Sequence, residues 1–372
     1  MKKNRRVLSI MLIFVMIMTS ALLTAFAAGE DAAVDAGDQD VEVIDDFDFD
    51  DAAVEEEPVA EDVVAEEDLE MVAEDAKNAG TDQAQVADVT NLKAVPGYKK
   101  VTVSWTGVQG ATGYVVSYAP GSKAVNVTGT SFVLKDPAYN TNYTFKVVAK
   151  VGDSASAGVT ATCKTDRKIK PITYKFKMKM SATLKSHGGS KKKLRLKSGE
   201  TIKANRFKSG KYVITRNKGT YFINRTRARN PKAVYTRKYN YTRAEAEHFV
   251  NGIKMSSKKK QLIWVSTYCQ HAYAFKGSKG KWKCVRDWEL STGRADAPTP
   301  TGVNGKVSLW KKLSFRHGLQ WWSCFSSYNA FHGKQSSWSV GKPASSGCIR
   351  NKNKDAKWIY NNVPISTRVY IY

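Results

Sequence analysis

Acidic and basic residues are separated along this chain, and the separation limits what each part can fold into. The 372 residues carry 59 Lys and Arg and 34 Asp and Glu. Of these acids, 24 lie between Glu30 and Asp88, whereas residues 90–372 hold ten acids against 54 Lys and Arg. The acidic stretch repels itself and has few aromatic side chains, so we expect a disordered linker over residues 29–87. A fraying helix around Val63–Val72 is the alternative.

The first 28 residues have the three parts of an export signal. Four Lys and Arg residues lie between Lys2 and Arg6, an apolar run follows from Val7 to Leu23, and small residues at Ala25 and Ala27 end it. This pattern predicts a signal peptide over residues 1–28 that is cleaved on export. An uncleaved anchor is the alternative, because the apolar run is long enough to cross a bilayer. Both readings predict a secreted protein, in the cell wall or on the outer face of the cytoplasmic membrane.

The chain has five cysteines, an odd number for a protein in an oxidising compartment. At least one thiol should therefore be unpaired. A bridge between Cys269 and Cys284 is one possibility, and small buried hydrophobic side chains are the other. The remaining cysteines are Cys163, Cys324 and Cys348.

Residues 88–166 alternate apolar and polar side chains with a period of two. Val101, Val103 and Trp105 alternate with Thr and Ser, and further strands are predicted over residues 114–118 and 142–149. Short strands separated by turns within about eighty residues predict a β-sandwich. Trp105 and Tyr143 stand where a fibronectin type III domain has its core tryptophan and its corner tyrosine, so this segment resembles that family. The resemblance implies a binding or spacing module.

Residues 170–258 are rich in Lys and Arg and contain short strands between glycines, over residues 210–214 and 219–223. This pattern predicts a small basic β-barrel-like region, and it resembles a bacterial Src-homology-type wall-binding barrel. Thr242 and Glu245 form a predicted capping box that opens a short helix over residues 244–251. His248 on that helix is expected to be a surface or packing residue.

Residues 260–372 carry the candidate chemistry. A hairpin is predicted over residues 262–265 and 272–275, a helix from about Asn353, and a last strand over residues 367–372. Cys348 follows a glycine, whose backbone freedom lets amides gather at a sulfur, and His332 precedes it on a separate predicted strand. An imidazole that takes the thiol proton makes cysteine a strong nucleophile. Taken alone, however, the pair favours an inert buried cysteine and a packed histidine over a catalytic pair.

Six motifs in order resemble the catalytic domain of L,D-transpeptidases, the YkuD-type fold. They are the opening strand 262–265, the segment from Thr292-Gly293 to Pro298-Thr299-Pro300-Thr301-Gly302, His332-Gly333, Ser345-Ser346-Gly347-Cys348-Ile349-Arg350, the helix at Asp355-Ala356 and the closing strand. The resemblance covers about residues 260–372. It implies a mixed sheet and an acyl transfer between peptidoglycan stem peptides.

The resemblance also implies a role for each site residue. Cys348 would attack a stem-peptide carbonyl and form a thioester, and His332 would be the proton acceptor and donor. The Gly333 backbone carbonyl would orient the His332 ring, and amides near Gly347 would hold the oxyanion. Arg350 and Ser346 would contact substrate, although a structural ion pair is the alternative for Arg350. Many members of the family have a second histidine at the position of Ser346, which puts a contribution to substrate binding in doubt.

Other conspicuous side chains are expected to have no catalytic role. His317 precedes a glycine but lies outside the family's interval, and His187 and His271 match no motif. Trp321, Trp322 and Phe325 are expected to pack in the core, with a substrate cleft as the alternative. The Cys and His spacings predict no metal site and no cofactor.

The sequence therefore predicts a mainly β, multidomain protein: an exported cysteine acyltransferase that cross-links peptidoglycan through a thioester. A non-catalytic cell-wall-binding or scaffolding protein is the alternative. The expected partners are donor and acceptor stem peptides, and anionic cell-wall polymers that the basic body attracts. Export argues against nucleic acid as the partner of that charge. Contact with the membrane is expected only through an uncleaved signal segment.

Overall fold

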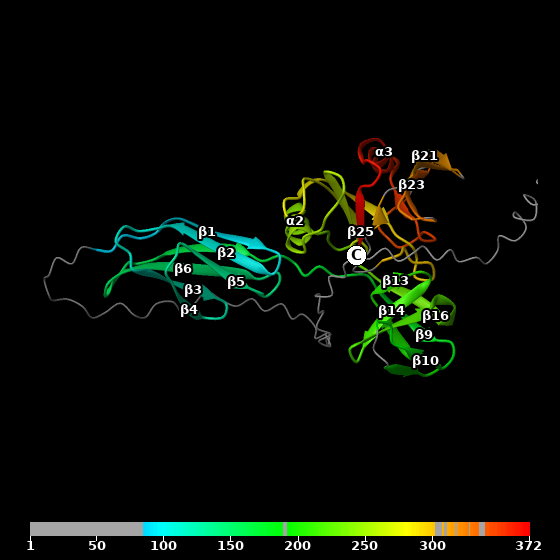
Figure 1. Cartoon of the computed structure of the whole chain (residues 1–372), viewed down its shortest axis with the longest axis horizontal. Coiled ribbons are helices and arrows are strands. Elements are labelled where there is room, and N and C mark those ends of the chain that lie inside the picture. The colour runs from blue at the N-terminus through cyan, green and yellow to red at the C-terminus, as the bar shows by residue number, and fades with distance from the viewer. Residues whose placement is uncertain are drawn as a thin grey trace, which may run out of the picture. The chain divides into compact units, whose positions relative to one another are not determined.

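The computed structural model describes residues 85–188, 192–301, 307–308, 311–316, 318–326, 328–334 and 339–372. The predicted signal segment and nearly all of the predicted acidic linker lie outside these residues, as does His317. The described part is mainly β, as predicted, with several separate sheets (Figure 1). Within it, neither helix is long and apolar enough to cross a bilayer.

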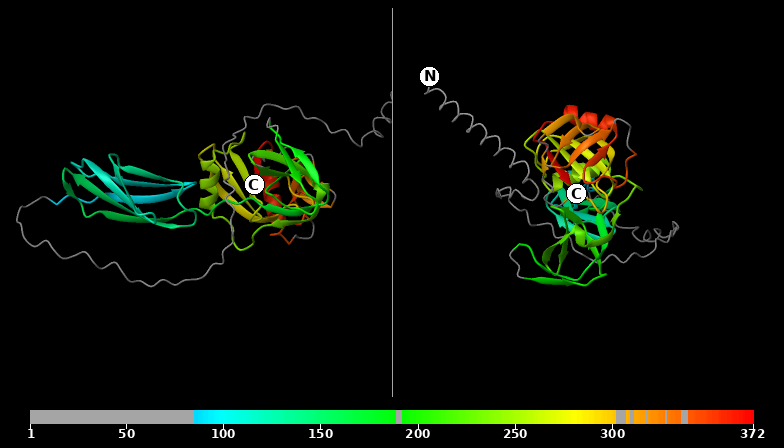
Figure 2. Two further views of the ribbon diagram at one scale, coloured as in Figure 1. Left: turned by 90° about the horizontal axis from the view of Figure 1, so that it is seen from below. Right: turned by 90° about the vertical axis from the view of Figure 1, so that its right-hand side faces the viewer.

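The first folded region is a sandwich of two antiparallel sheets, whose long strands run side by side in cyan and green in Figure 2. One sheet holds β1 (Thr90–Gly97), β2 (Lys100–Thr106) and β5 (Ser131–Lys135), and the other holds β4 (Lys123–Val127), β3 (Gly113–Ala119), β6 (Asn142–Val151), β7 (Ser154–Ala155) and β8 (Val159–Lys164). The period of two on β2 buries Val101, Val103 and Trp105, while the residues between them face outward. The Tyr143 hydroxyl accepts a hydrogen bond from the Ala138 N–H at 3.0 Å. The predicted sandwich is thus confirmed.

The basic middle region consists of three small sheets around one aromatic core. They are β12 (Thr201–Ala204), β9 (Thr173–Met178) and β16 (Ala228–Val234); β13 (Arg206–Lys208), β14 (Lys211–Arg216) and β15 (Gly219–Asn224); and the hairpin β10 (Ala182–Lys185) and β11 (Lys193–Leu196), with a 3-10 helix η1 (Arg225–Arg227). Phe176 and Phe207 pack on Tyr212 with ring centroids 4.5 and 5.2 Å away. The strands therefore share a core without forming one closed sheet.

The C-terminal region is built on a nine-stranded mixed sheet. Its order is β20 (Val307–Ser308), β25 (Arg368–Ile371), β17 (Gln261–Ser266), β18 (His271–Lys276), β19 (Lys283–Ser291), β24 (Ile349–Asn351), β23 (Ala330–Lys334), β22 (Leu319–Cys324) and β21 (Lys311–Arg316). The β17–β25 and β23–β24 pairs are parallel, and the other pairs are antiparallel. The predicted hairpin of β17 and β18 is confirmed.

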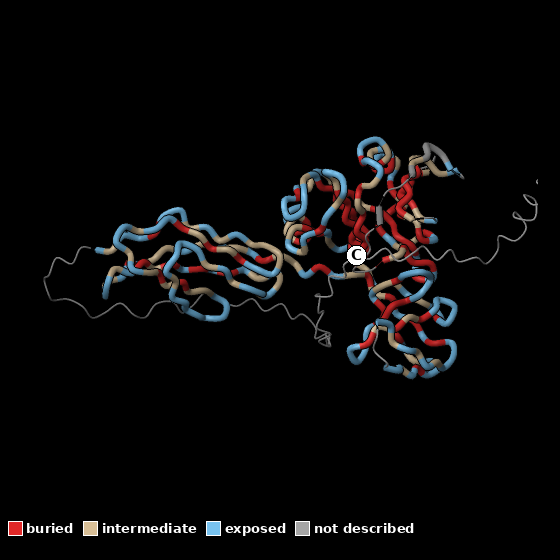
Figure 3. The backbone as a smooth tube through the Cα atoms, viewed as in Figure 1, coloured by how far each residue is buried: buried red, intermediate tan, exposed pale blue. Residues whose placement is uncertain are grey.

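Two helices bury opposite faces of this sheet. Alternate residues of β17 belong to two different cores: Trp264 packs with Phe249 of α2 (Arg243–Gly252), and Ile263 lies in the core that includes Ile359 of α3 (Asn353–Asn362). Burial on both faces explains why β17 reads as a continuous apolar run. Figure 3 shows buried residues, in red, gathered in this C-terminal region. Thr242 and Glu245 form the capping box of α2, as predicted.

Candidate active site

His332 lies in the middle of β23, and Cys348 directly precedes the neighbouring strand β24. The two strands pair in parallel, with Phe331 opposite Ile349 and His332 opposite Arg350. The sheet thus brings together two residues that have fifteen others between them in the sequence. They also share surroundings: Cys348 packs against the cluster of Trp322, Cys324 and Ala330, and the His332 ring stacks on Trp322.

The His332 ring is fixed on one side by the backbone. Its Nδ1 atom lies 3.1 Å from the Gly333 carbonyl oxygen, so Nδ1 carries the proton and donates it, and Nε2 is left as the acceptor. Position 333 has no room for a side chain, because a Cβ there would lie 2.3 Å from Asn353 Oδ1. That oxygen also accepts the Lys334 N–H at 2.9 Å. The His-Gly pair therefore sets both the tautomer and the fit against α3.

Trp322 shields His332 from water. The two rings are nearly parallel, 13° apart with centroids at 5.2 Å, and only 3% of His332 is exposed. Burial disfavours the imidazolium and lowers the His332 pKa to about 4, with the Arg350 charge acting in the same direction and the Gly333 hydrogen bond opposing it. His332 is therefore a neutral base at neutral pH.

Cys348 rests as a thiol. Burial raises the pKa of this thiol, while hydrogen bonds to sulfur from the Ala330 backbone N–H and the Asn329 side chain oppose the rise. The thiol itself points at the Tyr328 carbonyl oxygen, with sulfur and oxygen 3.8 Å apart. The resting site is thus a neutral thiol near a neutral imidazole. Two donors, the Ala330 N–H and the Asn329 side chain, are placed to stabilise negative charge on the sulfur.

Asn329 is held so that its amide nitrogen faces the nucleophile loop. Ser326 Oγ donates to Asn329 Oδ1 at 2.9 Å and accepts the Asn329 N–H at 3.0 Å. With the oxygen engaged, Nδ2 is directed at Gly347, where an added Cβ would lie 2.6 Å from it. Gly347 also has φ +113°, a conformation that favours glycine. Both the backbone angle and the lack of space for a Cβ therefore require glycine at this position.

The Thr-Gly and Pro-Thr segments hold the loop that carries Cys348. Gly293 forms a parallel bridge with Ser345, and the Gly293 N–H donates to Thr299 Oγ1 at 2.8 Å. A Cβ on Gly293 would collide with the backbone of Ala297 and Thr299. These motif residues are structural supports for the site.

The Gly347 N–H donates to Ser345 Oγ at 3.2 Å, so in this structure the amide expected at the oxyanion has a partner within the loop. The Ser345 hydroxyl in turn donates to the Cys348 carbonyl. Ser346 is exposed and accepts a hydrogen bond from Arg294 Nη1 at 3.1 Å. Burial lowers the Arg350 pKa, and the Arg294 charge lowers it further. Arg294 itself pairs with Asp296, with Nε and Oδ1 2.8 Å apart.

The other conspicuous residues lie outside this constellation. His271 is buried with Nε2 3.0 Å from Asp287 Oδ2, and His248 contacts Asp166 at the same distance. Phe325 packs on Phe331, in agreement with a core role. All five cysteines are free, so the possible Cys269–Cys284 bridge is not formed. In the described residues no group of three His, Cys, Asp or Glu side chains is arranged to hold a metal ion.

Sequence reasoning missed Asn329 and the role of Trp322. Neither residue belongs to a motif, and both reach the site through the fold. Trp321 adopts φ +55° where the register of β22 against β23 shifts between Gln320 and Ser323. This bulge changes the simple alternation of the strand, and the face of Trp322 cannot be read from the sequence pattern.

Comparison with known proteins agrees with this site. Residues 260–371 match the family model of the L,D-transpeptidase catalytic domain, YkuD. The putative L,D-transpeptidase YkuD of Bacillus subtilis is 30% identical over 89 residues, which are 24% of this chain and 54% of that protein. The putative L,D-transpeptidase YciB of the same organism is 28% identical over 131 residues, 30% of this chain and 67% of that protein. The predicted resemblance is confirmed for this segment, although the chain spans only about half the length of the first of these relatives.

Solved structures resemble separate parts of the chain. An L,D-transpeptidase from Stackebrandtia nassauensis is 16% identical with a TM-score of 0.27, and covers 35% of this chain and 67% of that one. The fn3 domain of human collagen alpha-1(XX) chain is 26% identical with a TM-score of 0.23, and covers 25% of this chain and 97% of that one. Scores of this size add nothing to the strand order and core described above.

Proposed function

We propose that this protein is an exported L,D-transpeptidase that cross-links peptidoglycan stem peptides through a thioester on Cys348. The observation that carries the proposal is the pairing of β23 with β24. It brings a buried, neutral His332 of fixed tautomer beside a cysteine that has its own hydrogen-bond donors. The family match over residues 260–371 supports the reaction class.

The neutral resting pair determines the order of proton transfers. As the Cys348 sulfur attacks the carbonyl carbon of the donor stem, its proton moves to His332 Nε2. The imidazolium then protonates the leaving amine of the terminal D-alanine, the C–N bond breaks, and a thioester remains. The amine of the acceptor stem next attacks the thioester and gives its proton to His332. Sulfur leaves as the thiolate and is reprotonated, which restores the resting site.

Asn329 and the Ala330 N–H stabilise negative charge during these steps. Both lower the pKa of the thiol against the effect of burial, so they favour the sulfur anion when the proton leaves. Fixed donors in a shielded site stabilise a developing anion without having to reorganise. The Gly347 N–H donates to Ser345 Oγ at rest. It stabilises the oxyanion of the substrate only after that hydrogen bond is broken.

Arg350 and Arg294 form the candidate site for a substrate carboxylate. The Arg294 charge lowers the pKa of Arg350, and a bound carboxylate would be attracted to both cations while sharing Arg294 with Asp296, whose Oδ1 lies 2.8 Å from Arg294 Nε. Arg294 also reaches Ser346, so a carboxylate held here would lie next to the nucleophile loop.

Release of D-alanine from a purified tetrapeptide stem tests the proposal. The Cys348→Ala variant should release none, whereas the Cys163→Ala variant should match the wild type, because Cys163 is a free thiol of the sandwich. With an acceptor stem present, mass spectrometry should detect the cross-linked dimer. A carbapenem should add to the wild type and to Cys163→Ala but not to Cys348→Ala. Undiminished release by Cys348→Ala would refute the assignment.

A further inference from the structure

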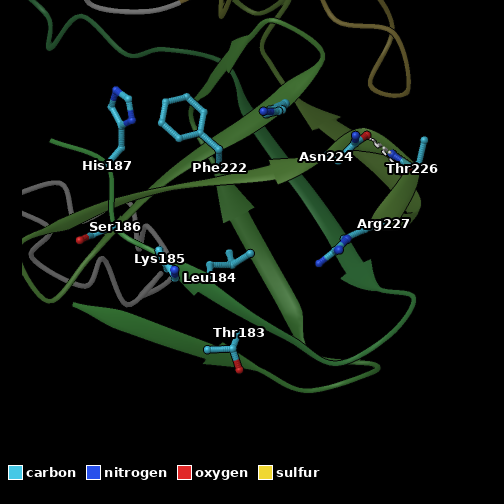
Figure 4. A pocket seen from close by; sticks show the side chains of 10 residues that line it. Thr183, Leu184, Lys185, Ser186, His187, Phe222, Asn224, Thr226 and Arg227 are labelled. Atoms are coloured by element: carbon cyan, nitrogen blue, oxygen red, sulfur yellow. Dashed lines mark hydrogen bonds between the residues drawn. The ribbon is translucent and has the colours of Figure 1, made fainter. Parts of the chain in front are cut away.

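The basic middle region contains a pocket that has no part in the proposed reaction. It lies between β10 of the hairpin and the β14–β15 pair, with η1 at one end, and has a volume of about 550 Å³ (Figure 4). Its lining residues are Thr183, Leu184, Lys185, Ser186, His187, Lys211, Phe222, Asn224, Thr226 and Arg227. We call it the basic pocket. A volume of this size suits a ligand of a few sugar rings, whereas a lone inorganic ion would fill little of it.

The charge of the basic pocket has one sign. Lys185, Lys211 and Arg227 line it, and no carboxylate does. Among the ion pairs of the described residues, none involves these three side chains. The neighbourhood offers little compensation, because residues 170–235 hold twenty Lys and Arg but one acid. That acid, Glu200, pairs with Arg216 at 2.8 Å. Like charges that line one pocket with no carboxylate among them favour an anionic ligand.

The rest of the lining is suited to a sugar. The half-buried Phe222 ring packs edge-on against His187, with centroids 5.1 Å apart, and Leu184 adds apolar surface. Asn224 Oδ1 accepts from both Thr226 N and Thr226 Oγ1, at 3.1 and 3.0 Å, so its Nδ2 remains as the donor (Figure 4). Aromatic and apolar surface beside polar donors matches the mixed faces of a pyranose ring.

We propose that the basic pocket binds a phosphate-bearing glycan. Lys185, Lys211 and Arg227 contact the phosphate oxygens, and Phe222 packs against a sugar ring. The ligand is a polymer of sugar phosphates, in which charge and sugar recur together. Such binding holds the protein on an anionic polymer independently of the reaction at Cys348.

Fluorescence anisotropy of the full chain with labelled poly(N-acetylglucosamine 1-phosphate) tests the proposal. The pocket variant replaces Lys185, Lys211 and Arg227 with Gln. We expect it to weaken binding about tenfold or more. The slope of log affinity against log salt should fall by about 2, since each phosphate contact contributes about 0.7 for a single strand.

A matched control removes the same charge from another face of the same region. Lys175, Lys203 and Lys232 are exposed on adjacent strands of the β12–β9–β16 sheet and do not line the pocket. Their triple Gln variant should bind within about threefold of wild type, because only long-range attraction is lost. Equal weakening by both triple variants, or by neither, would show that no pocket is involved.

The sugar is tested separately from the charge. Phe222→Leu should weaken binding of the sugar-phosphate polymer and leave binding of inorganic polyphosphate unchanged. If Phe222→Leu weakened binding of both polymers equally, the pocket would be a site for phosphate alone, and the proposal that it recognises a sugar would be wrong. Oligothymidylate that binds as tightly as the sugar-phosphate polymer, and loses affinity in the pocket variant, would identify a nucleic-acid site instead. Thermal melting confirms that each variant is folded. If the triple variant is not, Arg227→Gln at an exposed position replaces it, with an expected salt slope smaller by about 0.7.

Discussion

The stacking of Trp322 on His332 should govern how acidic a solution the enzyme tolerates. With the His332 pKa at about 4, the base is neutral in about 97% of molecules at pH 5.5. With an ordinary pKa of about 6.5, it would be neutral in about 9%. Because protonated His332 cannot accept the thiol proton, wild-type kcat/KM should be nearly the same at pH 5.5 and 7.5. An unshielded histidine would cost about tenfold at the lower pH.

The perturbation is Trp322→Leu, which removes the stacked ring and admits water to His332. We expect the acid limb of kcat/KM for D-alanine release to move from near pH 4 toward 6.5. Trp321→Leu is the matched control, since the Trp321 ring packs on Tyr360 and Lys357 and has no stack with His332. The substrate carboxylate titrates at about 3.5 and does not disturb the range of interest. A wild-type limb between pH 6 and 7, or an unmoved limb in Trp322→Leu, would refute the reasoning.

Hydrogen bonds around the site and at the start of α2 give three more predictions. Asn329→Ala should lower kcat/KM by about a hundredfold, because a donor to the sulfur is lost. It should also slow iodoacetamide alkylation of Cys348 at pH 8. Unchanged rates would contradict this prediction. Gly347→Ala should abolish D-alanine release and lower the Tm more than Gly280→Ala, because Gly280 also has a positive φ, +77° against +113°, but an added Cβ there would meet no atom within 4 Å. Burial tends to raise the Glu245 pKa, but hydrogen bonds from Arg167 and Thr242 outweigh burial and lower that pKa. The carboxylate therefore stabilises the fold above the ordinary Glu pKa. This stabilisation is lost as the pH falls through the lowered pKa. Glu245→Gln should therefore cost about 3 kcal/mol in urea unfolding at pH 7, and the cost should shrink as the pH falls through that lowered pKa.

The sequence predicted the elements whose signal is local. Period-two alternation predicted β2 of the sandwich, the Thr242–Glu245 capping box predicted α2, and the motif order predicted Cys348 and His332 as a pair. Each of these rests on residues within a few positions of one another, or on a family pattern.

The parts that were missed depend on tertiary contacts. Asn329 reaches Cys348 because Ser326 turns its amide, and Gly347 leaves room for it across the loop. Trp322 meets His332 only after the bulge at Trp321. The pKa values of the site are likewise invisible in sequence, because burial is their largest cause and burial belongs to the fold.

A resting thiol at Cys348 has a consequence for a protein that we propose is exported. Oxidants react with thiolates, and burial raises the pKa of this thiol, so its thiolate fraction at pH 7 is small. The donors Asn329 and Ala330 oppose this rise at rest, and full loss of the proton to His332 accompanies attack on a substrate carbonyl. We therefore expect hydrogen peroxide at pH 7 to oxidise Cys348 no faster than free cysteine, as followed by peptide mass spectrometry. Oxidation many times faster than free cysteine would show a thiolate already formed at rest, and the neutral-pair mechanism would then be wrong.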